Sequence, residues 1–566
     1  MGVPQFFHWL VTHHESELLR DIYPDAKPAE YFFLDFNCGI HPAAKQEGIE
    51  TLEDMYQAIC QYLELLIKHV QPTKLIYIAI DGVAPMAKMR QQRFRRFKSI
   101  QDTREKDKID RRFKCWKEQK FDFNMISPGT EFMNQLTIRL RQFIVGKWTS
   151  TKVILSDASS PREGEHKIMS YLRKEVPQDA RVLIYGLDSD LIFLSLLQHR
   201  PKMCLFREKI FFQDQPEQKS EKEFTYLDIS AMKRIVIESL SQHSLSTNPV
   251  DLLHQEFKKK GLITPVTSKD IKKSNNDSRL ILDYVALSFI LGNDFLPYLP
   301  SLKIKEGGLD RVMECYAQVR ANAKSDMYLV DSSTFQFSYP FLLSLLQEIS
   351  EYELSDFEEH REASLLRQQK FKGSFRYRQA DAYQKALLEF EYVENKTPDQ
   401  LKLGKPGWKA RYYQYYLGDP SQFTTPMIKN YLEGLVWMLK YYTGDCPSWT
   451  WQYRFRVAPA ASCLLDFLKK NPTFLSETRF EPSEPVSTEQ QLLMILPPQS
   501  NKLLPEAVRK LMTDVDSPII HLYPTDFKLD LEGHRYRWEC YPILPNGHQA
   551  LIYPSTNYKE TTTKFD

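Results

Sequence analysis

Residues 181–190 read RVLIYGLDSD, a short apolar run that ends in two acids. Three other runs have the same design: YFFLDF (31–36), KLIYIAIDG (74–82) and KVILSD (152–157). Between the first two of these lies TLEDMYQAICQYLELLIKHV (51–70), whose apolar residues recur at helical spacing. This alternation of strand, helix and strand predicts an α/β fold with a mainly parallel central sheet flanked by helices. Each strand delivers an acid at or just beyond its carboxyl end, where open α/β sheets place their sites.

The composition is that of a globular protein, with 566 residues of which 42% are hydrophobic and 26% charged. The formal net charge is only +2, so any attraction to nucleic acid must come from locally clustered charge. The eight cysteines show no zinc-site spacing, which favours a reducing compartment. There is no basic leader with a cleavage site and no apolar run of about 18 residues, so we expect neither secretion nor membrane insertion.

Positive charge gathers in residues 86–120, which contain 14 Lys and Arg residues against five Asp and Glu residues and no Gly or Pro. This stretch predicts a long basic helix. Its simplest alternative readings are a solvated helix or a nuclear localisation signal. Residues 200–225 are polar and predict irregular structure, and residues 263–279 predict a loop. The second half of the chain is rich in Tyr and Trp, most of which we expect to pack in a core or an interface.

Seven acids are the candidate site residues: Asp35, Asp81, Glu163, Glu165, Asp188, Asp190 and Asp294. Taken singly, an acid after a strand is more often a helix cap than a ligand. If the seven converge, their repulsion would raise their pKa values unless cations lie between them. Oxygen ligands without His or Cys favour Mg²⁺ or Mn²⁺ over zinc, and two such ions can promote displacement at phosphorus. The acids therefore predict metal-dependent hydrolysis of phosphodiester bonds.

Long motifs in the chain resemble the catalytic core of the Xrn family of 5′→3′ exoribonucleases. The motifs are MGVPQFFHWL (1–10), LDFNCGIH (34–41), YIAIDGVAPMAKMRQQRFRRF (77–97), SPGTEFM (127–133), EGEHKIM (163–169), YGLDSDLIFLSL (185–196) and LGNDFLPYLP (291–300). Others resemble the family's second conserved region: GWKARYY (407–413), YLEGLVWMLKYYTGDCPSWTWQYRFRVAP (431–459), LPPQSNKLLP (496–505) and SPIIHLYPTDFKLDLEG (517–533). The resemblance spans nearly the whole chain.

The resemblance implies a flap-endonuclease-like nuclease core in residues 1–345, a charged and mostly helical linker in residues 346–400, and a second region in residues 401–566 that braces and encloses the active site. It also implies a minimal family member, without the C-terminal accessory domains or the zinc knuckle of larger members. By position, the seven acids become the ligands of two Mg²⁺ or Mn²⁺ ions.

The resemblance further implies a pocket for the 5′-phosphate of the substrate, formed by Lys88, Gln92, Arg95 and Arg96. On a helix these four positions share one face, so three cations and an amide could surround a phosphate. His41 and Trp437 fall where the family stacks bases of the 5′ end, and Trp449 and Trp451 remain competitors for that role.

The chain departs from the family pattern at a few positions near the site. Met86 stands where the family usually has Arg, Arg90 where it has a small polar residue, Arg162 where it has Gly, and Cys38-Gly39 where it has Gly followed by an apolar residue. None of these changes removes an expected ligand. They bear on the shape of the phosphate pocket and of the loop after Asp35.

The expected reaction is hydrolysis of single-stranded 5′-monophosphorylated RNA to nucleoside 5′-monophosphates, in mRNA decay after a decapping enzyme has acted. We expect a cytoplasmic monomer, with the nucleus as the alternative compartment. Two other functions use the same features: a structure-specific flap nuclease acting on DNA, and a non-catalytic RNA-binding scaffold of the same fold. The seven acids speak against a scaffold, because a protein that only binds RNA has no use for carboxylates that repel one another.

Overall fold

The computed structural model describes residues 5–25, 27–209, 223–242, 276–324 and 327–545. Its main sheet has seven strands: β1 (Leu19–Arg20), β2 (Tyr31–Asp35), β3 (Leu75–Ala79), β4 (Lys152–Ser156), β5 (Val182–Tyr185), β6 (Met203–Glu208) and β7 (Phe224–Asp228). Their order is β1-β7-β6-β5-β2-β3-β4. The five strands from β6 to β4 are parallel, whereas β7 is antiparallel to both of its neighbours. The expected mainly parallel α/β sheet is confirmed.

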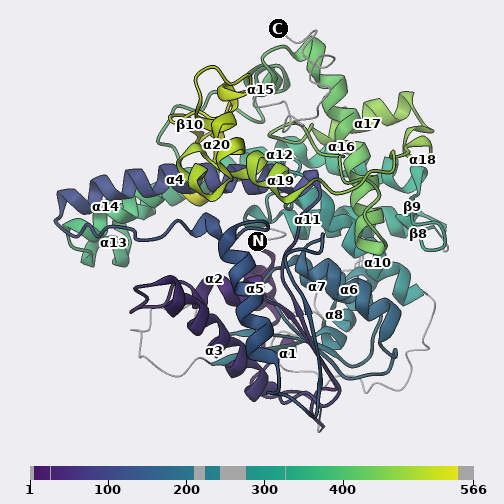
Figure 1. Cartoon of the computed structure of the whole chain (residues 1–566). Coiled ribbons are helices and arrows are strands. Elements are labelled where there is room, and N and C mark those ends of the chain that lie inside the picture. Colours follow the sequence, from purple (N-terminus) through teal and green to yellow (C-terminus); the bar gives the residue numbers. More distant parts are fainter. Residues whose placement is uncertain (1–4, 26, 210–222, 243–275, 325–326, 546–566) are drawn as a thin grey trace.

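Helices cover both faces of this sheet (Figure 1). One face carries α2 (Asn37–Ala43), α3 (Leu52–Val70) and α5 (Glu131–Ile144). The other carries α1 (Phe6–Leu18), α6 (Gly164–Glu175), α7 (Asp190–Leu196), α8 (Ile229–Gln242) and α10 (Asn276–Ser288). Successive side chains of β2 point to opposite faces of the sheet. Phe32 and Leu34 therefore face the first set of helices, and Phe33 faces the second. Thr51 caps α3 with a reciprocal capping box to Asp54, so the helix begins where the sequence predicts.

The second half is mostly helical. It contains α11 (Gly308–Asn322), α12 (Tyr339–Gly373), α13 (Phe375–Gln379), α14 (Ala382–Glu391), α15 (Trp408–Leu417), α16 (Pro420–Thr443), α17 (Ala461–Lys470), α18 (Phe474–Glu477), α19 (Thr488–Ile495) and α20 (Glu506–Thr513). Two hairpins, β8 (Val330–Asp331) with β9 (Gln336–Phe337) and β10 (Lys528–Asp530) with β11 (Tyr541–Ile543), complete it. Short 3₁₀ helices are η1 (Phe123–Met125), η2 (Phe289–Leu291), η3 (Ile304–Glu306), η4 (Pro498–Leu503), η5 (Ile520–Leu522) and η6 (Arg537–Glu539).

One hydrophobic core runs from the sheet into the second half without a break. It joins Phe33 and Ile184 of the sheet to Trp437 and Tyr441 of α16. Tyr412, Tyr413 and most other aromatic residues of the second half are buried in it, which confirms that their main role is packing. The expected boundary between residues 345 and 346 lies within α12, and the division into three regions stays a prediction.

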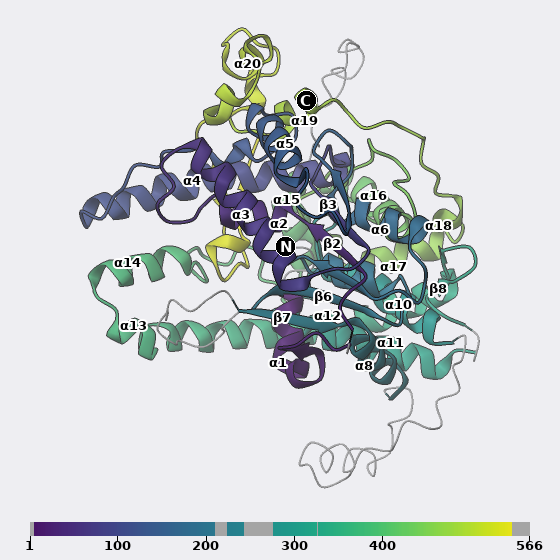
Figure 2. The same ribbon diagram turned by 60° about the horizontal axis from the view of Figure 1, so that its bottom comes forward.

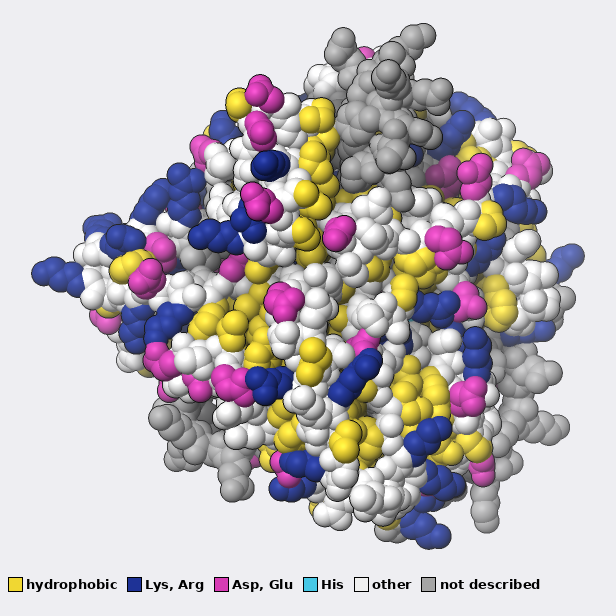
Figure 3. Space-filling model, in the orientation of Figure 1, with side chains coloured by type: hydrophobic (Ala, Val, Ile, Leu, Met, Phe, Trp, Pro, Cys, Tyr) yellow, Lys and Arg dark blue, Asp and Glu magenta, His cyan; other side chains and the backbone are white. Residues whose placement is uncertain are grey.

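A projecting arm is built from α4 (Met86–Arg112) together with the distal part of α12, α13 and α14 (Figures 1 and 2). The buried residues of α4 end at Phe97 and those of α12 end at Phe357, so each helix leaves the core at that point. Across the arm, Tyr383 Oη donates to Asp110 Oδ1 at 2.9 Å. Lys and Arg side chains alternate with Asp and Glu side chains on the visible face of the arm (Figure 3), as expected for a solvated helix.

Three expectations need correction or a limit. The basic helix ends at Arg112, eight residues before the predicted end, because Lys114 adopts a left-handed backbone with φ of 60° that stops a helix. Residues 203–208 form strand β6, although the stretch was expected to be irregular. Of the predicted loop at 263–279, residues 263–275 lie outside the described residues and residues 276–279 begin α10. Among the helices that the structure describes, none is both long and apolar enough to cross a membrane.

Candidate active site

Four of the seven acids stand at the carboxyl ends of neighbouring parallel strands. Asp35 is the last residue of β2, and Asp81 follows β3 by two residues. Asp188 follows β5 by three residues, and Asp190 is the first residue of α7. Because β5, β2 and β3 are adjacent and parallel, these side chains meet at one edge of the sheet.

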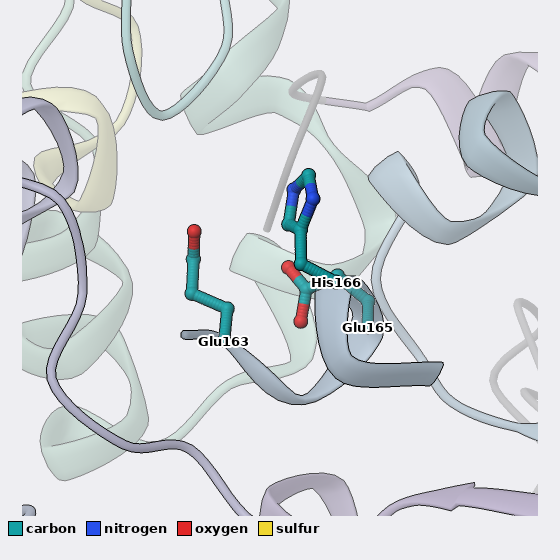
Figure 4. Close-up of side chains that lie close together, drawn as sticks. All are labelled: Glu163, Glu165 and His166. Carbon is teal, nitrogen blue, oxygen red and sulfur yellow. The ribbon is translucent and has the colours of Figure 1, made fainter. Parts of the chain in front are cut away.

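Helix α6 brings two more acids to the same edge. Glu163 is its N-cap residue and Glu165 lies in its first turn, with exposed fractions of 3% and 8%. Figure 4 shows both carboxylates beside the ring of His166, the next residue of the helix. Oxygen atoms of Asp35, Asp81 and Glu165 lie within 4.8 Å of one another, as do ligand atoms of Glu163, Glu165 and His166. Glu165 therefore belongs to both groups.

The backbone of Gly164 makes this convergence possible. Its N–H donates to Asp81 Oδ1 at 2.7 Å, so it orients that carboxylate. A Cβ atom at this position would lie 2.5 Å from Asp35 Oδ1 and 3.3 Å from Asp81 Oδ1. A residue with a side chain would thus push the acids apart, and glycine between Glu163 and Glu165 is a requirement of the site.

The seventh acid, Asp294, is tied to Glu163 by a buried lysine. The ammonium of Lys88, near the start of α4, lies 2.6 Å from Glu163 Oε1 and 2.7 Å from Asp294 Oδ2. Gln91, one turn further along α4, donates to Asp294 Oδ1 at 3.2 Å. Burial alone would lower the pKa of Lys88, but Asp294 and Glu163 outweigh burial and raise it well above the usual value.

The carboxylates of this buried site repel one another strongly when they are charged. Burial and then Asp81 raise the pKa of Asp35 well above its usual range, and burial and then Glu163 do the same to Glu165. Burial and Asp294 raise the pKa of Asp190 to about 7. Mutual repulsion in a buried site is relieved when cations lie between the oxygens.

The donor set fits divalent cations. Asp35 Oδ1 and Asp190 Oδ1 are buried, and neither has a hydrogen-bond partner within the described chain. A buried carboxylate oxygen without a partner is costly unless a ligand satisfies it. The donors are carboxylate oxygens, with one histidine at the margin, which is the ligand chemistry of Mg²⁺ or Mn²⁺. Which ion binds, and how many bind, stays a prediction.

Two members of the predicted 5′-phosphate pocket present buried polar atoms on α4. Gln92 Oε1 and Arg96 Nη1 are buried and lack a hydrogen-bond partner among the described residues, while Arg96 Nη2 donates to Ser127 Oγ at 2.7 Å. Arg95 is exposed. The ammonium of Lys88, by contrast, is engaged by Glu163 and Asp294. The four residues share the face of α4 on which Lys88 meets the acids, and their role in binding phosphate stays a prediction.

The two residues expected to stack on bases lie in different surroundings. His41 in α2 is close to the arginines of α4: burial, followed by the charge of Arg95, lowers its pKa to about 4. Trp437 is fully buried, its Nε1 donates to Ser448 O at 3.0 Å, and its ring stacks on Trp451 at 5.2 Å. Stacking of Trp437 on a base would require the neighbouring rings to move, whereas Trp449 and Trp451 are partly exposed. All of these roles stay predictions.

Sequence reasoning missed the aromatic residues that hold the acids in place. Tyr441 Oη, from α16, donates to Glu163 Oε2 at 3.0 Å, and its ring stacks on His166 at a centroid distance of 3.8 Å. Tyr442 hydrogen-bonds to Asp190. The pair YY ends the motif YLEGLVWMLKYY, but an aromatic-rich segment does not reveal which distant acid its hydroxyl groups will meet.

An open, mainly parallel sheet whose carboxyl edge gathers buried carboxylates defines an α/β protein with a carboxylate site that fits divalent cations. Residues 1–209 match the family described as "XRN 5'-3' exonuclease N-terminus", and residues 274–394 and 377–552 match "Xrn1 helical domain". The chain belongs to the XRN family of 5′→3′ exoribonucleases.

Relatives from two animals and a fungus support this assignment. The chain is 31% identical to "5'-3' exoribonuclease 2 homolog" of Drosophila melanogaster over 96% of its own length and 69% of the relative. It is 30% identical to "5'-3' exoribonuclease 2" of Gallus gallus over 96% of its length and 68% of that protein. It is 28% identical to "5'-3' exoribonuclease 1" of Schizosaccharomyces pombe, of which it covers 47%.

Proposed function

We propose that this protein hydrolyses single-stranded RNA from a 5′-monophosphate end, one nucleotide at a time, and releases nucleoside 5′-monophosphates. The observation that carries the proposal is that α4 presents buried polar atoms of Gln92 and Arg96, unpartnered within the described chain, one and two turns beyond Lys88, whose ammonium contacts two of the carboxylates. A site that holds a terminal phosphate beside the reacting phosphodiester must cut from that end.

The seven acids would hold two Mg²⁺ or Mn²⁺ ions, with Glu165 shared between the two groups of ligands. When bound, such ions supply a hydroxide nucleophile near neutral pH and stabilise the leaving oxygen. Tyr441 and Gly164 keep Glu163 and Asp81 in position by hydrogen bonds of 3.0 and 2.7 Å. Preorganised ligands of this kind need no rearrangement when the substrate arrives.

The phosphate pocket would supply both direction and selectivity. Arg96 is only 9% exposed and its guanidinium is fixed by Ser127, and we propose that it closes a pocket for a single phosphate group. A cap or a triphosphate is too large for such a pocket, whereas a 5′-hydroxyl end lacks the charge that the arginines bind. His41, kept neutral by burial and by Arg95, offers a ring face to the first base.

We further propose that the protein acts in cytoplasmic mRNA decay, as a monomer, on ends that a decapping enzyme has exposed. A pocket that accepts only a monophosphate makes decapping a necessary earlier step for capped RNA. Cell fractionation with and without inactivation of decapping tests this part. Continued decay of the target RNAs after decapping is inactivated, or location of the protein outside the cytoplasm, would contradict it.

The deciding experiment compares RNA oligonucleotides of one sequence with monophosphate, triphosphate, hydroxyl and capped 5′ ends. With Mg²⁺ the monophosphate substrate should be degraded at least tenfold faster than the others, and EDTA should abolish the reaction. Asp190→Asn should remove most activity, since each 1.36 kcal/mol of lost transition-state stabilisation is about tenfold in rate. Equal rates on all four ends would refute the pocket.

The same assay separates the two alternatives. Single-stranded DNA and flap DNA of matched sequence are added as substrates, because a flap nuclease would prefer the flap. A scaffold would bind RNA but leave it intact with any metal ion. Faster cleavage of flap DNA than of RNA, or binding without cleavage, would replace the proposal.

A further inference from the structure

A large cavity lies along the side of α4 that faces the β10–β11 hairpin. Its volume is about 830 Å³, within the range of about 300–1,000 Å³ typical of ligand sites. At one end it is lined by Asp294 and by Ser189, which stands between Asp188 and Asp190. The cavity is therefore continuous with the carboxylate site. We call it the α4 cavity.

The α4 cavity is elongated. Gln91, Phe94, Lys98, Asp102 and Lys106 of α4 all line it, at spacings of three or four residues that keep them on one face of the helix. From Gln91 to Lys106 this face is about 22 Å long at 1.5 Å per residue. That length exceeds one nucleotide, since successive phosphates of a stacked strand lie about 3.4 Å apart along its axis.

Positive charge exceeds negative charge on its walls, with six Lys and Arg residues against four Asp and Glu residues. Lys98 is paired with Asp102, and Lys305 with Glu539. Lys106 is exposed and forms no ion pair with another described residue. The guanidinium of Arg207 lies 3.7 Å from the ring centroid of Phe7. Lys106 is thus available to contact an anionic ligand in the cavity.

Two aromatic rings of the hairpin segment are exposed in the same cavity. Trp538 is 52% exposed and is backed by Tyr536, whose ring is nearly parallel at 13° with a centroid distance of 6.2 Å. Tyr541 is 37% exposed and packs edge-on against Phe94 at 6.2 Å. Supported aromatic faces beside cations are the combination with which proteins bind single-stranded nucleic acid without regard to sequence.

We propose that the α4 cavity binds the nucleotides on the 3′ side of the scissile bond, with Trp538 stacking on a base and Lys106 contacting a phosphate. This inference rests on the proposed RNA hydrolysis and extends it, because it assigns a holding site for the strand that remains after each cut. A track of this length suits a continuing strand, whereas the released mononucleotide would need only a fraction of it.

The test measures binding as a function of length. In an Asp190→Asn background, 5′-phosphorylated RNAs of two and eight nucleotides carry a 3′ fluorophore, and anisotropy gives Kd in Mg²⁺. Trp538→Ala should weaken binding of the eight-nucleotide RNA by about 5- to 150-fold, the equivalent of about 1–3 kcal/mol for one stacked base, and leave the dinucleotide unchanged. Trp116→Ala, at a 37% exposed tryptophan outside the cavity, is the matched control and should change neither.

A surface variant keeps the test valid should Trp538→Ala fold poorly. Lys106→Ala should reduce the slope of log Kd against log salt by about one for the eight-nucleotide RNA, whereas Lys108→Ala, which is two residues away and lines a different cavity, should not. Two results would overturn the proposal: unchanged binding of the long RNA, or equal loss of binding for both lengths. Failure of the end-group assay, by contrast, would refute the RNA hydrolysis itself.

Discussion

The ammonium nitrogen of Lys88 lies 2.6 Å from Glu163 Oε1, in a region where both side chains are at least 90% buried. The same nitrogen lies 2.7 Å from Asp294 Oδ2. A lysine of α4 thus neutralises two acids that reach the site from α6 and from the loop after η2. Four predictions follow from this geometry and from the surroundings of the acids.

Lys88→Met should destabilise the protein most when divalent ions are absent. Removing one partner of a buried ion pair costs about 3–5 kcal/mol because the remaining charges are uncompensated. Excess Mg²⁺ should recover part of this loss, because the carboxylates left without Lys88 should bind a cation more tightly than those of the wild type do. Urea unfolding in EDTA and in Mg²⁺ measures both. A loss that is the same in the two buffers would show that Lys88 does not act through the charge of the acids.

Gly164→Ala should reduce the rate of RNA hydrolysis at least 100-fold. The added methyl group would lie 2.5 Å from Asp35 Oδ1, so the Asp35 and Asp81 carboxylates must move apart. Gly373→Ala is the control, because a Cβ atom there meets nothing within 4 Å. That variant should keep full activity and gain about 0.4–1 kcal/mol of stability. Similar activity in the two alanine variants would contradict the role assigned to Gly164.

At position 162 we expect glycine to give a more stable protein than alanine, which is the reverse of the usual order. The backbone φ of Arg162 is 97°, in the region that favours glycine, and its side chain pairs with Asp445 at 2.9 Å. Arg162→Gly and Arg162→Ala both remove the ion pair, but only Ala retains the strain of about 1–3 kcal/mol. We expect the Gly variant to be the more stable of the two, although glycine is normally worse than alanine by about 0.5–1 kcal/mol. Thermal unfolding of the pair decides it, and a more stable Ala variant would be the contrary result.

Asp283 should make stability fall as pH rises toward neutrality. Burial raises its pKa to about 7 even though Tyr316 Oη and the N–H groups of Leu329 and Val330 donate to it. Because the folded pKa lies above the unfolded value of about 3.9, the contribution to stability is complete below pH 4 and is lost as pH rises through about 7.

Asp283→Asn removes this titration. Between pH 5 and 7 the free energy of unfolding of the wild type should fall relative to the variant by up to about 1.4 kcal/mol per pH unit. Urea unfolding of both proteins across this pH range gives the difference between their free energies of unfolding. The contributions of the other titrating groups cancel in this difference. Parallel curves would show that the carboxyl group stays charged.

Local signals in the sequence were enough for the sheet and for the acids. An apolar run that ends in an acid is a short-range pattern, so β2, β3, β4 and β5 could be predicted together with the convergence of Asp35 and Asp81. Strand β6 was missed because its residues stand beside a long polar stretch. The end of α4 was missed because a left-handed backbone at Lys114 has no glycine to mark it.

The contacts that complete the site could not be predicted, because they join distant parts of the chain. Tyr441 meets Glu163 and stacks on His166 only after α16 has packed on the sheet. Similarly, nothing local indicates that Lys88 points to Glu163 and Asp294. Tertiary packing determines which group a hydroxyl or ammonium contacts, and the periodicity of the sequence does not indicate that contact.

The hydrogen bond from Tyr441 to Glu163 joins the carboxylate site to a segment that is synthesised late. A chain growing on the ribosome has all seven acids once residue 294 is made, but α16 is complete only about 150 residues later. Until then Glu163 lacks its tyrosine and the core of the sheet lacks the helix that closes it. A nascent chain that lacks α16 therefore has its seven acids but not the contacts that hold Glu163 in place.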